Sequence, residues 1–422
     1  MSHSAPRLDS FSHRSTRAAF AAAGAIGFAI PVSVALDNIL LGVVLLAWLA
    51  GGGPRSLPAD LPRTRVAQAA LALFALLAAG ILWSAHPAEG LHVLGKYADL
   101  VFVPVFATLF HAAADRRRAA ACLIAALLLT LVLSYLTRAG LVPQGYPSIG
   151  TPAEPEVFKK YLTQNILMAC GAFLFAVLAR EAATPRARLA WSAAAAFAAV
   201  NVLFMLSGRS GQIILVLLAA YFCIAAWRWR GVLALVLAAV LAAGVLTAKA
   251  DNDALSQPAG GPRKSGFATV LRDFEAWREG RLSSTSTAQR LDYAVTSLAI
   301  LREHPLAGVG TGGFADAYAR QVEGSRREPT VNPHNEYLNL GVQLGLPGIA
   351  LLVLLFALVW REAAALPTAL ERDLARGLAL AFAAGSLLNS LLMDHAEGLF
   401  FAWSAGVLFG GLAPRPPQEP AT

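Results

Sequence analysis

The sequence predicts an all-α polytopic membrane protein with about twelve membrane-spanning helices and one helical domain outside the membrane. Three observations support this prediction. Apolar runs long enough to cross a bilayer recur along the whole 422-residue chain. Only 14% of the residues are charged, whereas a soluble protein of this size would have about 25%. Arginines, finally, are concentrated in every second connection between the apolar runs.

The apolar runs define the expected spans, each of which needs about 20 residues. Their approximate limits are 18–36, 38–51, 66–84, 98–114, 118–138, 162–180, 187–206, 210–227, 231–249, 336–360, 372–392 and 398–413. The run from 187 to 227 is too long for one crossing, and Ser207-Gly208-Arg209-Ser210-Gly211 interrupts it. This polar, glycine-containing break predicts a tight hairpin between two helices.

The arginine pattern predicts the orientation. One set of connections holds most of the arginines, among them Arg14, Arg63, Arg117, Arg186, Arg228, Arg372 and Arg415. The alternate short connections hold only Lys96, Arg138, Lys159, Lys160 and Arg209. Positive charge is retained on the cytoplasmic side of membrane proteins, so both termini are expected in the cytoplasm. The formal charge of +8 therefore reflects orientation and does not indicate nucleic-acid binding.

A polar segment on the outside separates two groups of spans. We divide the chain into a bundle of about nine helices, an outside domain, and a bundle of about three helices with a cytoplasmic tail, at residues 1–249, 250–335 and 336–422. In the outside domain, apolar spacing predicts helices near 267–279 and 286–303. A glycine-rich turn and a short helix near 313–323 follow.

The outside domain ends in the stretch Val331-Asn332-Pro333-His334-Asn335-Glu336-Tyr337-Leu338. A neutral imidazole accepts protons near neutral pH, which suits His334 to act as a general base. Pro333 fixes the backbone before the next helix. Asn335 and Glu336 can orient the ring or cap the helix, and Tyr337 adds a phenol. The alternative is that the whole cluster is a helix-start cap at the membrane interface.

Four cationic residues on the same face are candidate anion ligands. Arg209 lies in the predicted hairpin, where neighbouring glycines allow a phosphate to approach the forked guanidinium. Arg290 lies near a helix N-terminus, a place that favours anions. Lys159 and Lys160 precede the sixth span and could contact lipid phosphate or a substrate diphosphate. The alternatives are a snorkelling Arg209 and a solvated Arg290.

Other polar motifs are weaker candidates. Gly308-Val309-Gly310-Thr311-Gly312-Gly313 has no preceding strand and no GK[ST] continuation, so we interpret it as a turn of close backbone approach and not as a nucleotide loop. Asp251-Asn252-Asp253 could bind a metal but more simply ends the ninth span. Asp394-His395-Ala396-Glu397 is expected as a polar turn in the last outside connection. The three cysteines have no metal-ligand spacing.

The order of these motifs resembles that of one superfamily. Ser207-Gly208-Arg209 in a hairpin precedes a long outside loop with Gln289-Arg290-Leu291-Asp292, His304-Pro305-Leu306-Ala307-Gly308-Val309-Gly310 and His334-Asn335-Glu336-Tyr337-Leu338. Over about residues 160–345 the arrangement resembles the O-antigen ligase and O-antigen polymerase superfamily of bacterial inner membranes. The number of spans and the place of the large loop, between the ninth and tenth, look most like the ligases.

The resemblance implies a glycosyltransferase of the bacterial inner membrane whose active site faces the periplasm. Such a ligase transfers a glycan from undecaprenyl diphosphate to a sugar hydroxyl of lipid A–core oligosaccharide, with inversion, without a metal or cofactor, and completes lipopolysaccharide. By motif position, His334 would be the general base, and Arg209 and Arg290 would hold the diphosphate. Lys159, Lys160, Asn335 and Tyr337 remain further candidate substrate contacts, taken from their position alone. Asp37, in the first outside connection, is a rival base.

Three other functions share many of these features. An O-antigen polymerase would use an acceptor that is itself linked to lipid diphosphate, and a protein O-oligosaccharyltransferase of the same superfamily would transfer to Ser or Thr. A transporter of lipid-linked substrates would also have many spans and buried arginines. The charged residues here gather at one face and do not follow a path through the membrane midplane, which favours an enzyme.

Overall fold

The computed structural model describes residues 5–61, 64–143, 148–231, 274–275, 277–279 and 285–412. Within these ranges the chain is helical, with one isolated bridge between Ile149 and Val157 and no strand, so the all-α prediction is confirmed. The first part contains α1 (Ala5–Val32), α2 (Val34–Ala50), α3 (Gly53–Asp60), α4 (Arg65–Gly80), η2 (Ile81–Trp83), α5 (Pro87–Lys96), η3 (Ala98–Val101), α6 (Phe102–Leu109), α7 (Ala113–Arg138), α8 (Tyr161–Glu181), α9 (Pro185–Val200), the π-helical η4 (Asn201–Met205) and α10 (Arg209–Trp227).

The second part contains α13 (Ser286–Glu303), α14 (Phe314–Val322), α15 (Glu336–Glu362), η5 (Ala363–Ala365), α16 (Ala369–Gly385) and α17 (His395–Phe409). The expected helices at 286–303 and 313–323 are therefore present. The expected hairpin is also present, because α9 and η4 end just before Arg209 begins α10. Most of the expected helix at 267–279 and the ninth span at 231–249 lie outside the described residues.

The described helices include seven that are long and apolar enough to cross a membrane, or up to nine if each of two bent pairs is one span. The first bent pair is α2 and α3, which meet at 87° where Gly52 adopts a left-handed φ of +82°. The second joins α5 to η3 and α6 at 55°. Helices α16 and α17 have only 17 and 15 residues. The described part of the chain thus shows seven to nine candidate spans and does not reach the expected twelve.

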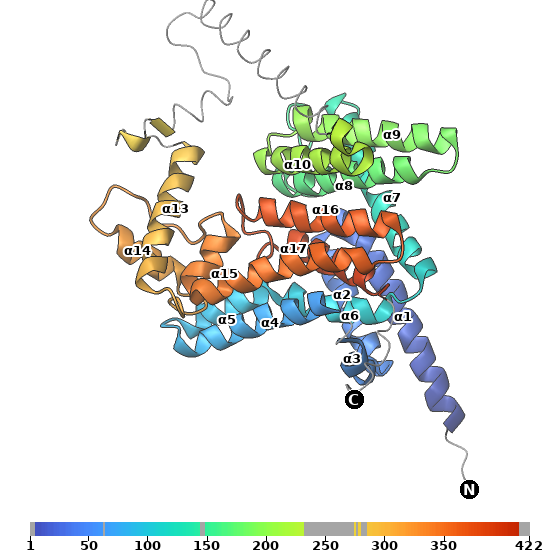
Figure 1. Cartoon of the computed structure of the whole chain (residues 1–422), viewed down its shortest axis with the longest axis horizontal. Coiled ribbons are helices and arrows are strands. Elements are labelled where there is room, and N and C mark those ends of the chain that lie inside the picture. The colour runs from blue at the N-terminus through green and yellow to red at the C-terminus, as the bar shows by residue number, and fades with distance from the viewer. Residues whose placement is uncertain are drawn as a thin grey trace, which may run out of the picture.

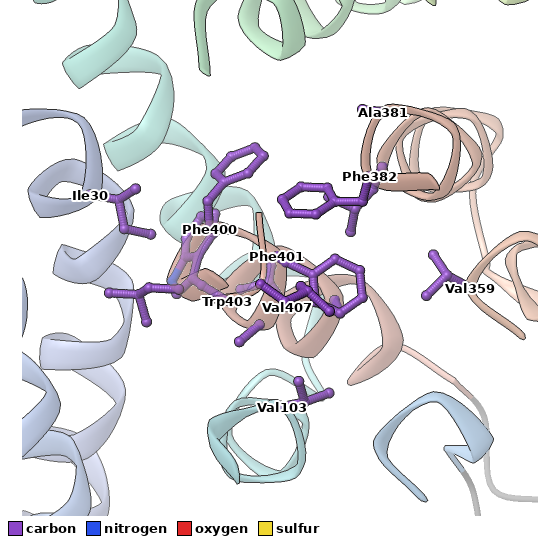
Figure 2. Close-up of a cluster of buried hydrophobic side chains, with 14 of the residues drawn as sticks. Ile30, Val103, Val359, Ala381, Phe382, Phe400, Phe401, Trp403 and Val407 are labelled. Carbon is purple, nitrogen blue, oxygen red and sulfur yellow. The ribbon is translucent and has the colours of Figure 1, made fainter. Parts of the chain in front are cut away.

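Helix α17 lies at the centre of the bundle, between α16 on one side and α4 and α6 on the other (Figure 1). Figure 2 shows that its apolar side chains reach four neighbouring helices, with Phe400, Phe401, Trp403 and Val407 packed among Ile30, Val103, Val359 and Phe382. The indole Nε1 of Trp403 also donates to the Ala23 carbonyl of α1, at 2.7 Å. A Cβ on Gly27 would lie 2.6 Å from the Trp403 ring, so a small residue is required where α1 meets α17.

A second, smaller apolar cluster joins α13 and α14 to the first part of α15. It is formed by Ile300, Phe314, Ala317, Tyr318, Val322 and Val342. Both helices lie at one end of the molecule, beyond the end of α15 that begins at Glu336 (Figure 1). This packing ties α13 and α14 directly to α15, the helix that follows them.

Helix α15 is broken at Gly345, which has φ +68° and ψ −162°. The break frees Val342 O from its helical partner Leu346, and Gln343 O has no helical donor because Pro347 lacks an N–H. The segment before Gly313 satisfies them, because Val309 N–H donates to Val342 O and Gly310 N–H donates to Gln343 O, both at 2.9 Å. The break therefore makes residues 336–344 a separate short helix that is held by the glycine-rich turn.

Candidate active site

Three basic side chains from distant segments come together at the end of the bundle that carries α13. Arg209 is the first residue of α10, Arg290 lies in α13, and His334 lies in the loop before α15. Partial burial lowers the pKa of Arg290, and the charge of Arg209 lowers it further. Partial burial likewise lowers the pKa of His334, and the charge of Arg290 adds to this effect. Arg290 is therefore close enough to Arg209 and to His334 for its charge to interact with each of them.

No hydrogen bond or ion pair joins the guanidinium group of either arginine to another residue in the described part of the chain. Arg209 and Arg290 are both exposed to solvent. Two guanidinium groups of like charge repel each other, and here no carboxylate of the described residues offsets that repulsion. The arrangement favours an anionic ligand with more than one negative charge, such as a diphosphate.

The first turn of α10 is shaped by close contact with α8. Asn165 Nδ2 donates to the Gly208 carbonyl at 2.8 Å. A Cβ on Gly208 would lie 2.6 Å from that Nδ2 atom, and a Cβ on Gly211 would lie 2.4 Å from Asn165 Oδ1. The glycines therefore allow α8 to approach the start of α10 closely. Arg209 lies at this helix N-terminus, where the backbone also favours negative charge.

His334 has an unusual backbone conformation. Its φ is +52°, in the left-handed region that residues with a Cβ seldom adopt. Its N–H donates to Asn332 Oδ1 at 2.8 Å. Its ring lies 6.2 Å, centroid to centroid, from the ring of Tyr293, which follows Arg290 by three residues and so shares its face of α13. The lowered pKa keeps the imidazole neutral at neutral pH, as a base requires.

The side chains that follow His334 hold the start of α15. Asn335 caps the helix by accepting from Leu338 N–H at 3.0 Å, and its amide donates to Leu387 O. Tyr337 donates its hydroxyl to Ala383 O at 2.9 Å. These two candidate substrate contacts thus bond to the neighbouring α16 and the connection after it.

Glu336 is fully buried and stabilises the same helix start through hydrogen bonds. Its carboxylate accepts hydrogen bonds from the hydroxyl of Tyr97 and from Leu392 N–H. Asn339 donates to the same Tyr97 hydroxyl at 3.0 Å, and Gln343 continues the network to Gly312 N–H at 2.7 Å. Glu336 therefore anchors the helix and is not exposed to a ligand.

The two candidate lysines have different surroundings. The Lys159 side chain is 7% exposed, and its Nζ lies 3.7 Å from Asp37 Oδ2. Burial lowers the pKa of Lys159, and the nearby Asp37 and Glu397 oppose this effect. Lys160 is exposed. Of the pair, only Lys160 presents its charge to solvent, while Lys159 balances a buried carboxylate.

The rival base Asp37 belongs to a separate buried cluster. His395 lies between two carboxylates, with Nε2 3.0 Å from Asp37 Oδ1 and Nδ1 3.0 Å from Asp99 Oδ2. These contacts raise the pKa of His395 to about 10. No group of three metal-ligand side chains occurs within the described ranges, and Asp251 and Asp253 lie outside them.

Sequence interpretation missed several residues of this site. Tyr161, the first residue of α8, lies near enough to influence the pKa of Arg290. Tyr293 could have been found, because it shares a predicted helix face with Arg290. Asn332 and Ser390 are joined by a hydrogen bond of 2.8 Å, and no local sequence pattern indicates a pairing at that separation.

Comparison with protein families gave a match over the middle of the chain. Residues 193–353 match the family model described as O-antigen ligase, and the match contains Arg209, Arg290 and His334. No curated protein matches the chain significantly. Over residues 193–353 the chain is therefore similar to the O-antigen ligases, which supports the resemblance to the O-antigen ligase/polymerase superfamily.

Proposed function

We propose that the protein is an O-antigen ligase. It transfers a glycan from undecaprenyl diphosphate to a sugar hydroxyl of lipid A–core oligosaccharide at the periplasmic face of the bacterial inner membrane. The observation that carries the proposal is the grouping of a neutral imidazole, His334, with two guanidinium groups, Arg209 and Arg290, that have no carboxylate partner in the described chain.

In the proposed reaction His334 removes the proton of the acceptor hydroxyl. The freed oxygen attacks the anomeric carbon, and the bond from that carbon to the diphosphate oxygen breaks. Negative charge accumulates on the departing lipid diphosphate, where Arg209 and Arg290 stabilise it more in the transition state than in the ground state. A single displacement inverts the anomeric centre.

Two guanidinium groups can neutralise a diphosphate without a divalent ion, so we propose that the reaction is metal-independent. Transfer should then continue in excess chelator. Loss of transfer that a divalent ion restores would assign a metal role to carboxylates such as Asp251 and Asp253.

The proposed topology follows from the arginine alternation in the sequence. Both termini are cytoplasmic, residues 250–335 form the periplasmic domain, and about twelve spans cross the membrane. Lys160 is proposed to contact the donor headgroup, because it is exposed directly before α8, whose first residue, Tyr161, lies near Arg290. We propose that three residues affect the substrate only indirectly, by holding the protein segments to which they are bonded: Lys159, Asn335 and Tyr337.

The deciding experiment is transfer by the purified protein with three acceptors in parallel. The acceptors are lipid A–core, a second lipid-linked repeat, and a peptide with Ser and Thr. Glycan on lipid A–core supports the ligase. Product on the second repeat or on the peptide would instead identify a polymerase or a protein glycosylase. Movement of the donor across vesicles without any product would identify a transporter.

A further inference from the structure

The connection between α16 and α17, residues 386–394, contains three buried polar side chains. Ser386, Asn389 and Ser390 are 0%, 2% and 1% exposed. Buried polar groups normally have hydrogen-bond partners, because leaving one unpaired is costly. The partners of Asn389 and Ser390 lie beside the basic residues of the active site.

Ser390 reaches the loop that carries His334. Its hydroxyl donates to Asn332 Oδ1 at 2.8 Å, and the same oxygen accepts His334 N–H at 2.8 Å. Asn332 is itself held by Thr330, whose Oγ1 accepts Asn332 N–H at 3.3 Å. One amide oxygen thus joins Ser390 to the left-handed backbone of His334, which needs such support to persist.

Asn389 reaches the start of α10. Its Nδ2 donates to Ser210 Oγ at 2.6 Å, and both residues are buried. Ser210 follows Arg209 directly in the first turn of the helix. Asn389 therefore fixes the turn from which Arg209 projects.

The connection is anchored on either side of this pair. Ser386 O accepts Glu336 N–H at 2.8 Å, and Leu392 N–H donates to Glu336 Oε2 at 2.9 Å. Asn389 and Ser390 are consecutive, so their Cα atoms are about 3.8 Å apart. A displacement of one side chain is therefore transmitted to the other over a very short path.

We propose that Asn389 and Ser390 are positioning residues that hold the diphosphate-binding start of α10 and the His334 loop in register. This proposal rests on the proposed function, which identifies Arg209 as a diphosphate ligand and His334 as the base. Asn389 acts through Ser210 on Arg209, and Ser390 acts through Asn332 on His334. Neither side chain needs to touch the substrate.

The test compares Ser390→Ala and Asn389→Ala with Ser386→Ala in the full-length protein. Ser386 is a matched control, because its hydroxyl is equally buried and has no hydrogen-bond partner within the described ranges. In transfer assays we expect Ser390→Ala to lower kcat by about 10- to 100-fold with little change in the donor KM. We expect Asn389→Ala mainly to raise the donor KM, and Ser390→Thr, which retains the hydroxyl, to recover most of the kcat.

A second readout does not depend on activity. The rate at which diethyl pyrocarbonate modifies His334, followed by mass spectrometry against pH, reports the pKa of that residue. If Ser390→Ala lets the loop move away from Arg290, this pKa rises toward 6.5, while Ser386→Ala leaves it unchanged. An unchanged pKa in Ser390→Ala, or kcat and KM equal to those of Ser386→Ala, would overturn the proposal. A wild-type protein without transfer would refute the proposed function, and the pKa comparison would still decide the positioning role.

Discussion

His334 and Arg290 lie close together, although one is in the loop before α15 and the other in α13: partial burial lowers the pKa of His334, and the positive charge of Arg290 lowers it further. The same arginine is proposed to bind the donor diphosphate. A bound diphosphate would neutralise Arg290 and remove the repulsion that disfavours a protonated His334. Donor binding would therefore make the imidazole a stronger base at the time when a proton has to be removed.

The first prediction concerns the pH dependence of transfer. The acid limb of kcat/KM for the donor reports free enzyme and should lie below pH 6.5, because the pKa of His334 is lowered. The acid limb of kcat reports the donor complex and should lie at higher pH. In Arg290→Gln the acid limbs of kcat/KM and of kcat should coincide, at a pH nearer to 6.5 than that of the wild-type kcat/KM limb. Rate profiles of the purified variants against pH measure this, and an unshifted kcat/KM limb in Arg290→Gln would contradict the coupling.

The second prediction separates charge from geometry at the arginines. Arg209→Ala and Arg290→Ala should each reduce kcat/KM for the donor by about 10- to 100-fold, the value of a charge-assisted hydrogen bond. Arg209→Lys and Arg290→Lys should lose less, because Lys keeps the charge without the fork. Arg302→Ala is the control, since Arg302 is an exposed arginine at the far end of α13. Equal activity in all four variants would rule out a diphosphate clamp.

The third prediction concerns the glycine-rich turn that holds the break in α15. Gly308 has φ +64°, and a Cβ there would lie 2.4 Å from the Gln343 carbonyl carbon. Gly308→Ala should therefore cost the left-handed strain of about 1–2 kcal/mol and a further overpacking cost of about 1–3 kcal/mol. Gly324 has φ +71° with nothing within 4 Å of its Cβ position, so Gly324→Ala should show the strain alone. Unfolding temperatures in detergent give the comparison, and equal losses in the two variants would show that the close approach at Gly308 is unimportant.

The fourth prediction concerns the cluster of His395, Asp37 and Asp99. The contacts with Asp37 and Asp99 raise the pKa of His395 in the folded protein to about 10, above the usual value of 6.5. Its contribution to stability is therefore complete below pH 6.5 and is lost as the pH rises through 10. Lys159 and Glu397 also titrate near Asp37, so the difference between wild type and His395→Gln isolates the histidine. The difference in unfolding temperature should shrink from pH 6.5 to pH 10, and a constant difference would contradict the ion-pair assignment.

Much of the fold and the basic residues of the candidate site could be predicted from local sequence. Apolar periodicity predicts α13 and α14, and Ser207-Gly208-Arg209 marks the hairpin because few residue types form such a break. Arg209 could be selected as a charge in an otherwise apolar run, Arg290 from its place near a predicted helix N-terminus, and His334 as a potential base before a helix. Their proximity could not be derived from spacing, since it depends on how α13 packs against α15.

The remaining features depend on contacts between distant segments. The break at Gly345 lies two residues before Pro347, which removes a helical N–H and could have indicated it, and the bonds from Val309 and Gly310 show how the freed carbonyl groups are satisfied. Asn332 and Ser390 meet through tertiary packing alone. The count of about twelve spans is not confirmed within the described ranges, where the apolar runs at α16 and α17 form helices of only 17 and 15 residues.

The central claim is that His334 is the base of a glycan transfer. The most direct measurement is transfer from an undecaprenyl-diphosphate-linked glycan to lipid A–core by purified wild type, His334→Ala and His92→Ala. His92 is an exposed histidine of α5 and serves as the control. We predict product from wild type and His92→Ala, and none from a folded, membrane-inserted His334→Ala. Product from His334→Ala at the wild-type rate would contradict the account.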